Sequence, residues 1–279
     1  MSRRKALAFL AIAFAISWTA ITLSWLGGAR SIQQAREANG FFMIGPPVAA
    51  LVCSLLFDKG QRIRSLGLSL RPNRWWAAAV LTMVAYVSYV TAASNLFGWT
   101  NTQLSPDPRQ SAASVFRIPI ESIPAGPAGM IAVFAAAVLI FTIQSTLTEE
   151  LGWRGYLYRQ WRHLGFWHYS LATGLVWGVW HWPMVWYFGL DFGDNRMAGL
   201  AYYPLALMGL APMMTLLRDR GGSIWAPGIY HGTSNAVGII LFGELEHQSA
   251  PVFAQLLLFL PVWALIEWFR RKWPAEPVL

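Results

Sequence analysis

The sequence predicts an all-α integral membrane protein that crosses the membrane with about eight helices. Of its 279 residues, 56% are hydrophobic and only 12% are charged, whereas soluble domains carry about 25% charged residues. A soluble fold could not bury this much apolar surface. The apolar residues also gather in runs that are about long enough to cross roughly 30 Å of hydrocarbon at about 1.5 Å per residue. These runs cover residues 6–26, 41–57, 75–99, 128–147, 170–188, 197–217, 224–242 and 251–269.

The first run follows a basic start, Arg3, Arg4 and Lys5. A secretory signal peptide has a similar start, but its apolar region is about 7–15 residues long. Run 6–26 is longer, which favours an uncleaved spanning helix. Residues 101–127 are polar and rich in proline, which indicates a loop outside the membrane. With no internal repeat in view, we expect a single integral membrane domain over residues 1–279, with a motif-bearing core at 128–243.

The net charge of +8 does not indicate nucleic-acid binding, because the basic residues form blocks between apolar runs. Such blocks, including the loop 58–74, are typical of cytoplasmic segments. The sequence therefore predicts a multi-pass protein of the plasma membrane with both termini in the cytoplasm. Of the 21 lysines and arginines, this topology leaves outside only Arg30, Arg36, Arg109, Arg117 and Arg196.

Two adjacent carboxylates stand at the end of the fourth apolar run, in residues 148–155. On a helix, Glu150 and Arg154 are four residues apart and share a face, so they can form an ion pair. Glu149 points about 100° away from Glu150. We therefore expect Arg154 to hold Glu150 as structural support, and Glu149 to face a cavity. The alternative is that all three side chains anchor the helix end in the cytoplasmic interface.

A histidine lies inside the fifth run. His181 is costly to place in an apolar helix, and such residues usually face the protein interior. Trp177 is one turn earlier on the same face and could wall a pocket or orient the imidazole. Pro183 is expected to bend this helix beyond His181. The alternative is a histidine whose hydrogen bonds are satisfied by a neighbouring helix.

The seventh run carries a second polar pair, His231 and Asn235, again four residues apart on one face. Gly228 and Gly232 have the same spacing, which permits close approach of another helix. The alternative interpretation is a hydrogen-bonded contact between helices.

Together the three motifs indicate a catalytic site. Glu149, His181 and His231 would come from three helices, all toward the cytoplasmic side. One carboxylate and two imidazoles suit activation of water, either directly as general base and acid or around a divalent metal such as zinc. Asn235 could donate an amide hydrogen bond to a developing oxyanion. The usual zinc and serine hydrolase signatures, H-E-x-x-H and G-x-S-x-G, are absent from the sequence.

The ordered motifs, over residues 149–235, resemble those of the CPBP intramembrane proteases. This family, also called the ABI family, includes the type II CAAX prenyl endopeptidases and bacterial bacteriocin-immunity proteins. Trp177 is a departure, since the family more often has phenylalanine there. The departure keeps an aromatic side chain and bears on the shape of the pocket.

The resemblance implies a conical polar cavity open to the cytoplasm. It assigns Glu149 and His181 to activating the attacking water, and His231 and Asn235 to stabilising the oxyanion. Arg154 would be structural. Members of the family are described both as metalloproteases and as glutamate-dependent proteases, so both mechanisms stay open at this point.

The leading hypothesis is an intramembrane endopeptidase that cleaves a membrane-associated or prenylated, CAAX-like peptide. Its partners would then be membrane lipid and a membrane-associated peptide or protein substrate. One alternative is a transporter or proton relay, which also uses buried Glu and His residues. Another is a scaffold or immunity protein without proteolytic activity on the same fold.

Overall fold

The computed structural model describes residues 2–58, 66–99, 107–242 and 250–274. Lys59, Arg62 and Arg64 of the predicted basic loop lie outside these residues, as do residues 101–106 of the predicted outer loop. Across the described residues the chain is helical and has no strand. The α-helices are α1 (Ser2–Leu26), α2 (Arg36–Met43), α3 (Gly45–Phe57), α4 (Arg74–Leu96), α5 (Pro108–Phe116), α6 (Gly126–Ser145), α7 (Tyr158–Trp161), α8 (Phe166–Trp180), α9 (Trp182–Phe188), α10 (Arg196–Gly221), α11 (Trp225–Ala236) and α12 (Phe259–Lys272).

Helices of other types connect several of these elements. The segments η3 (Thr146–Leu157) and η5 (Val237–Phe242) are π-helical. The more tightly wound 3-10 segments are η2 (Ile120–Ser122), η4 (Arg162–Leu164) and η6 (Ala250–Leu258).

Among the described residues, 6 helices are long and apolar enough to cross a membrane. The predicted all-α polytopic membrane fold is therefore confirmed. Two of the predicted runs, 170–188 and 224–242, instead fall in pairs of shorter pieces, α8 with α9 and α11 with η5. The number eight thus stays a prediction. The six long helices are Arg3–Leu26, Ala38–Phe57, Arg74–Leu96, Gly126–Leu164, Arg196–Gly221 and Phe253–Lys272.

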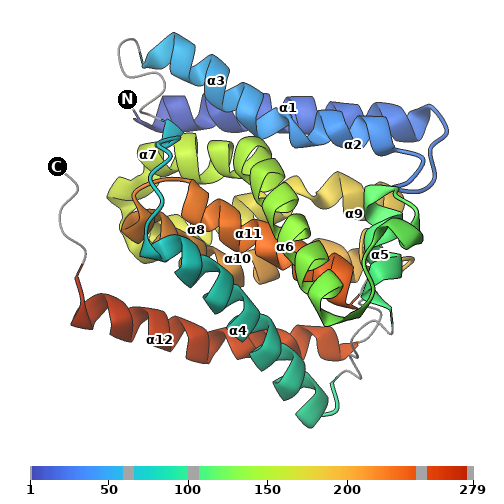
Figure 1. Cartoon of the computed structure of the whole chain (residues 1–279). Helices are drawn as coiled ribbons and strands as arrows, with labels where there is room; N and C mark the ends of the chain where they lie inside the picture. The colour runs from blue at the N-terminus through green and yellow to red at the C-terminus, as the bar shows by residue number, and fades with distance from the viewer. Residues whose placement is uncertain (1, 59–65, 100–106, 243–249, 275–279) are drawn as a thin grey trace.

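The helices form a bundle around η3, the π-helical part of the fourth span. Helices α1 and α3 lie side by side along one edge, α12 lies along the opposite edge, and α4 crosses the bundle obliquely (Figure 1). In the interior, α8 packs on α10 and α11 packs on α6, while α3 contacts η3. Large aromatic side chains fill the core between α1, η3 and α8, among them Phe9, Trp153 and Trp180. The segment η3 is thus enclosed by protein.

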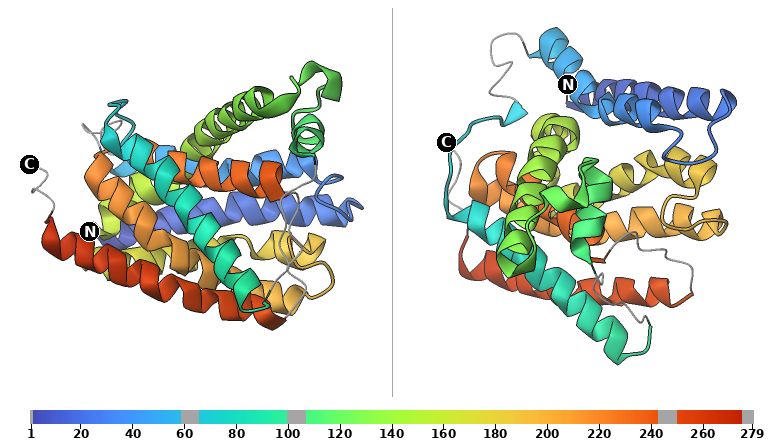
Figure 2. Two further views of the ribbon diagram at one scale, coloured as in Figure 1. Left: turned by 60° about the horizontal axis from the view of Figure 1, so that its bottom comes forward. Right: turned by 45° about the vertical axis from the view of Figure 1, so that its right-hand side comes forward.

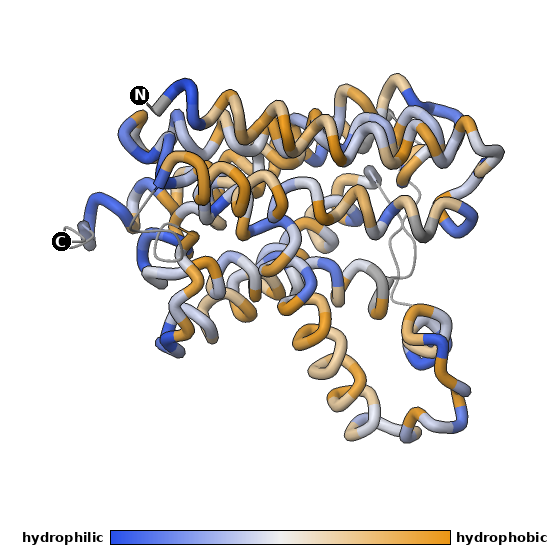
Figure 3. The backbone as a smooth tube through the Cα atoms, turned by 90° about the horizontal axis from the view of Figure 1, so that it is seen from above, coloured by the Kyte–Doolittle hydropathy of each residue, from blue (hydrophilic) through white to orange (hydrophobic). Residues whose placement is uncertain are grey.

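Helix α5 and the first half of α6 stand apart from the rest of the bundle in the left view of Figure 2. They have a small apolar cluster of their own, which joins Ala112 and Ile123 to Phe141 and Ala236. Coloured by hydropathy, the helices are mainly hydrophobic along their middles and hydrophilic near the two chain ends (Figure 3). The apolar bodies of the helices therefore match a bilayer core with polar ends outside it.

Both chain ends lie at the same end of the bundle (Figure 1). There, Lys5 Nζ is 2.7 Å from Asp58 Oδ1, and Arg159 lies 3.7 Å from the other oxygen of the same carboxylate. Arg220, at the end of α10, donates to the backbone carbonyl of Trp273. Basic segments from distant parts of the sequence therefore meet at this end. The side of the membrane that it faces stays a prediction.

Two glycines of α11 bring this helix against the central span. A Cβ atom added at Gly228 would overlap the side chain of Thr146, and one added at Gly232 would overlap the backbone nitrogen of Thr142. The close helix approach predicted from the glycine spacing is confirmed. As a result, His231 lies directly beside η3.

Candidate active site

The carboxylate motif lies on η3, within an unbroken helical stretch of 39 residues from Gly126 to Leu164. Within this stretch, residues 146–157 are π-helical instead of α-helical. Such wider turns are rare and occur frequently at functional sites. Gly152 and Gly155 permit them to pack tightly, since an added Cβ would lie 2.6 Å from Pro46 Cβ and 2.6 Å from the carbonyl oxygen of Leu66, respectively.

The three charged side chains of the motif are buried, with exposed fractions of 3% for Glu149 and 0% for Glu150 and Arg154. Arg154 Nη1 lies 3.1 Å from Glu150 Oε1, so the ion pair expected from the spacing is present. This depth argues against the alternative in which the motif only anchors a helix end at the interface. Buried charges need such partners, because an unpaired one is very costly.

Glu150 also contacts a histidine. His231 Nδ1 lies 3.0 Å from Glu150 Oε1, the same oxygen that pairs with Arg154. A carboxylate held by a guanidinium is an acceptor, so His231 Nδ1 is the donor in this contact. Glu150 thus has a second function that the sequence did not reveal, because it orients the imidazole of His231.

Glu149 is held by the second motif. Its Oε2 accepts a hydrogen bond of 2.5 Å from the indole Nε1 of Trp177. Its Oε1 lies 3.8 Å from Nε2 of His231. Of the two candidate histidines, His231 is therefore the one that an oxygen of Glu149 faces. That Glu149 also faces a cavity stays a prediction.

His181 lies at the break between α8 and α9, where Pro183 occupies the first turn of the new helix. The bend predicted at this proline is present, because proline cannot donate the next backbone hydrogen bond. The Nδ1 atom of His181 lies 2.9 Å from the carbonyl oxygen of Trp177. A carbonyl can only accept, so Nδ1 carries the proton and Nε2 carries the lone pair of the neutral ring.

Asn235 is half-buried on α11, one turn beyond His231. Its Nδ2 donates to Ser145 Oγ at 3.4 Å. Ser145 lies four residues before Glu149 on the same continuous helix. Asn235 therefore lies beside the helical turn that precedes Glu149, and its amide donates to the serine.

The donor chemistry of Glu149, His181 and His231 suits a divalent metal, since carboxylate and imidazole both bind zinc. Their geometry does not fit one: in the described part of the chain, no group of three His, Cys, Asp or Glu side chains is placed to hold a metal ion. One oxygen of Glu149 is also engaged by Trp177. No step below is therefore assigned to a metal.

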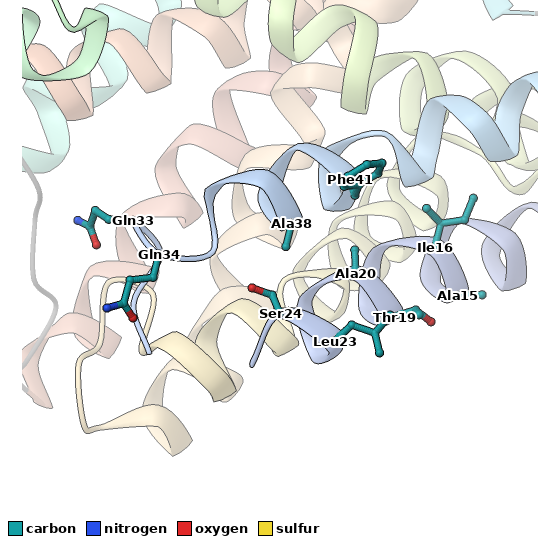
Figure 4. A pocket seen from close by; sticks show the side chains of 10 residues that line it. All are labelled: Ala15, Ile16, Thr19, Ala20, Leu23, Ser24, Gln33, Gln34, Ala38 and Phe41. Atoms are coloured by element: carbon teal, nitrogen blue, oxygen red, sulfur yellow. The ribbon is translucent and has the colours of Figure 1, made fainter. Parts of the chain in front are cut away.

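A cavity of about 970 Å³ lies between α1 and α2, away from these residues. Figure 4 shows its lining, in which Ile16, Leu23 and Phe41 are apolar and Gln33 and Gln34 stand at one end. None of the candidate catalytic side chains lines it. The polar cavity open to the cytoplasm, implied by the family resemblance, stays a prediction.

Several side chains beside the site were not predicted. Tyr203 of α10 stacks on the ring of His181, with centroids 5.3 Å apart, and donates a hydrogen bond to Asp191. Phe42 of α2 stacks on Trp180, next to His181. Aromatic residues are abundant throughout this sequence, so their composition alone could not single out these contacts.

A comparison with protein-family models gives one match. Residues 131–237 match the family described as type II CAAX prenyl endopeptidase Rce1-like, over a stretch that includes every candidate site residue. No curated protein matches the chain. The match confirms the resemblance predicted from the motifs: the central part of this membrane protein is similar to the Rce1-like type II CAAX prenyl endopeptidases.

Proposed function

We propose that this protein is an intramembrane endopeptidase that uses Glu149 and His181 to activate water. The observation that carries the proposal is the convergence of the three motifs on one carboxylate: Glu149 accepts from Trp177 and faces His231. The family match supports the class of reaction, because that family is one of CAAX endopeptidases. The residue roles below are our inference.

The attacking water would be polarised by Glu149 and by Nε2 of His181. The backbone contact of His181 Nδ1 leaves Nε2 with its lone pair, which can accept a proton or a hydrogen bond from water. Glu149 is the stronger candidate for the general base, since a carboxylate close to the reacting atoms can take up the proton as the nucleophile forms.

His231 and Asn235 would stabilise the oxyanion. The distance of 3.8 Å between Glu149 Oε1 and His231 Nε2 is too long for a direct hydrogen bond. Once Glu149 has taken up the proton of the water, an oxyanion beside both groups could accept a hydrogen bond from each of them. Glu150, paired with Arg154, keeps Nδ1 of His231 occupied and directs Nε2 toward that position.

The proposed reaction proceeds in two steps. Water adds to the scissile carbonyl carbon while Glu149 takes its proton, and the negative charge develops on the carbonyl oxygen next to His231 and Asn235. The carbon–nitrogen bond then breaks, and the proton moves from Glu149 to the leaving amine. The products are a carboxylic acid and an amine, which exchange a proton to give a carboxylate and an ammonium group.

The substrate we propose is a membrane-associated or prenylated peptide with a CAAX-like end. The site lies within long apolar helices, so a substrate anchored in the bilayer would reach it most directly. We further propose that the chain forms one membrane domain of the plasma membrane, with the basic end and both termini in the cytoplasm.

Glu149→Gln tests the proposal, because glutamine nearly preserves shape and removes the base. With a fluorogenic farnesylated CAAX peptide and purified protein in detergent, kcat should fall about 100- to 10,000-fold. The matched control is Glu121→Gln, at an exposed carboxylate in η2, which should leave kcat within about two-fold.

A folded Glu149→Gln protein that cleaves at the wild-type rate would exclude this mechanism. Absence of peptide cleavage by the wild-type protein, together with proton flux into proteoliposomes, would favour the transporter alternative.

A further inference from the structure

Trp177 contacts two of the candidate catalytic residues by hydrogen bonds, in addition to packing its ring in the core. Its side chain is 3% exposed, and its indole Nε1 donates to Glu149 Oε2 at 2.5 Å. Its backbone carbonyl oxygen lies 2.9 Å from Nδ1 of His181. One residue therefore holds both groups that we assign to water activation.

The indole ring is itself fixed from two directions. The guanidinium carbon of Arg154 lies 4.5 Å from the ring centroid, and the ring of His231 meets it edge-on at 5.1 Å. A guanidinium over an indole face is attracted by the ring electrons, most strongly where water is excluded. Arg154, which also pairs with Glu150, thus connects the anchoring ion pair to the indole.

Two other buried tryptophans show that this pairing is not a general consequence of burial. Trp153 on η3 and Trp180 on α8 are both fully buried. Their Nε1 atoms have no hydrogen-bond partner within the described part of the chain. The hydrogen bond from Trp177 to Glu149 is therefore a specific feature of this position.

The hydrogen bond from Trp177 fixes the orientation of the Glu149 carboxylate. With Oε2 bound to the indole, the remaining oxygen, Oε1, is the one that faces His231. A free glutamate side chain samples several rotamers, and each productive encounter would first have to select one. Holding the carboxylate in advance removes that cost from the reaction.

We propose that Trp177 is a positioning residue for catalysis, whose indole N–H orients the Glu149 carboxylate while its carbonyl orients His181. The proposal rests on the proposed function, in which Glu149 is the base. A phenylalanine at this position would keep an aromatic wall but could not donate the hydrogen bond.

The kinetic test is Trp177→Phe, assayed with the fluorogenic farnesylated CAAX peptide. Loss of a hydrogen bond to a charged group should lower kcat about 10- to 100-fold. KM should change less than about three-fold, because an aromatic ring is retained beside Glu149. Trp153→Phe is the matched control, with the same change at a buried indole without a partner, and should keep kcat within about three-fold.

A double variant separates positioning of Glu149 from a general loss of packing. In the Glu149→Gln background, Trp177→Phe should lower the residual rate less than about two-fold, because its target is already gone. If the two losses multiply, or if Trp177→Phe and Trp153→Phe lower kcat equally, the proposed role is wrong.

A spectroscopic test does not depend on cleavage. In protein labelled with ¹⁵N-tryptophan, the indole signal that disappears in Trp177→Phe identifies Trp177. That signal should move in Glu149→Gln, while the Trp153 signal, identified by Trp153→Phe, should stay in place. An unmoved Trp177 signal would overturn the proposal whatever the activity of the protein.

The outcomes also separate the two proposals. Full activity of Glu149→Gln would remove the proposed mechanism, even if the indole signal moves as expected. A large kcat loss for Glu149→Gln with wild-type kinetics for Trp177→Phe would leave the mechanism in place and remove the role of Trp177.

Discussion

His231 and His181 come from two helices beside the same motif, but they are held by different forces. Both nitrogens of His231 face carboxylates, with Nδ1 at 3.0 Å from Glu150 and Nε2 at 3.8 Å from Glu149. His181 is held by the backbone carbonyl of Trp177 and by the stacked ring of Tyr203. His231 is therefore held mainly by charged groups, and His181 by a neutral backbone hydrogen bond and ring stacking.

The difference matches the two tasks that we propose. A group that stabilises an oxyanion must present an N–H toward it, and the contact with Glu150 fixes the ring of His231 for that purpose. A group that accepts a hydrogen bond from water gains from a fixed neutral tautomer, which the carbonyl contact gives His181. The charged network should also be less tolerant of single changes, because removing one member leaves another buried and unpaired.

The largest effect is expected for Arg154→Met, which removes the guanidinium and leaves Glu150 buried. Breaking a buried ion pair from one side costs about 3–5 kcal/mol in the free energy of unfolding. Denaturation in mixed detergent micelles would measure it. The control is the double variant Glu150→Leu with Arg154→Met, which should recover much of the loss because no lone charge remains. A single variant as stable as the wild type would contradict the charged network.

Replacing each histidine with glutamine compares the charged contacts of His231 directly with the neutral contacts of His181. His231→Gln loses a hydrogen bond to a charged group and should lower the free energy of unfolding by about 1.5–3 kcal/mol. His181→Gln loses a neutral one and should cost about 0.5–1.5 kcal/mol. Both variants should lose peptide cleavage. Equal destabilisation in micelle denaturation would mean that charge does not distinguish the two histidines.

The position of His231 also depends on how closely α11 approaches α6. Gly232→Ala would place a Cβ against the Thr142 backbone, and the helices would have to separate. Overpacking of this kind costs about 1–3 kcal/mol. Gly238→Ala is the matched control, because a Cβ there meets no atom within 4 Å. If both alanine variants unfold at the same denaturant concentration, the close approach does not stabilise the site.

The sequence predicts those parts of the fold and the site that depend on local spacing. Long apolar runs predicted the spanning helices, and the spacing of Glu150 and Arg154 predicted their ion pair. The glycine pair of α11 predicted its close packing. In each case the pattern lies within one helix. The apolar runs and the ion pair need only that helix, and the glycine spacing shows that another helix can approach closely.

Other features could not be predicted, because they join residues from separate helices. Glu150 and His231 are 81 residues apart, and Glu149 and Trp177 are 28 apart. No single-sequence pattern specifies which nitrogen meets which oxygen across such distances. The close approach of α3 and residue 66 to the two glycines of η3 likewise joins separate segments. The interpretation of Glu150 as a structural anchor alone was incomplete for this reason.

The smallest expected effect concerns the shape that holds His181. Tyr203→Leu removes the stacked ring, and an aromatic contact of about 0.5–1.5 kcal/mol corresponds to a kcat loss of roughly 2- to 12-fold if it serves only to orient the imidazole. Tyr203→Phe keeps the ring and loses only the hydrogen bond to Asp191, so its kcat should stay within about two-fold of wild type. Steady-state cleavage of the farnesylated peptide would measure both variants. Wild-type kcat for Tyr203→Leu would show that the carbonyl of Trp177 orients His181 without help from the Tyr203 ring. The two histidines would then differ in that carboxylates hold His231 and a single backbone contact holds His181.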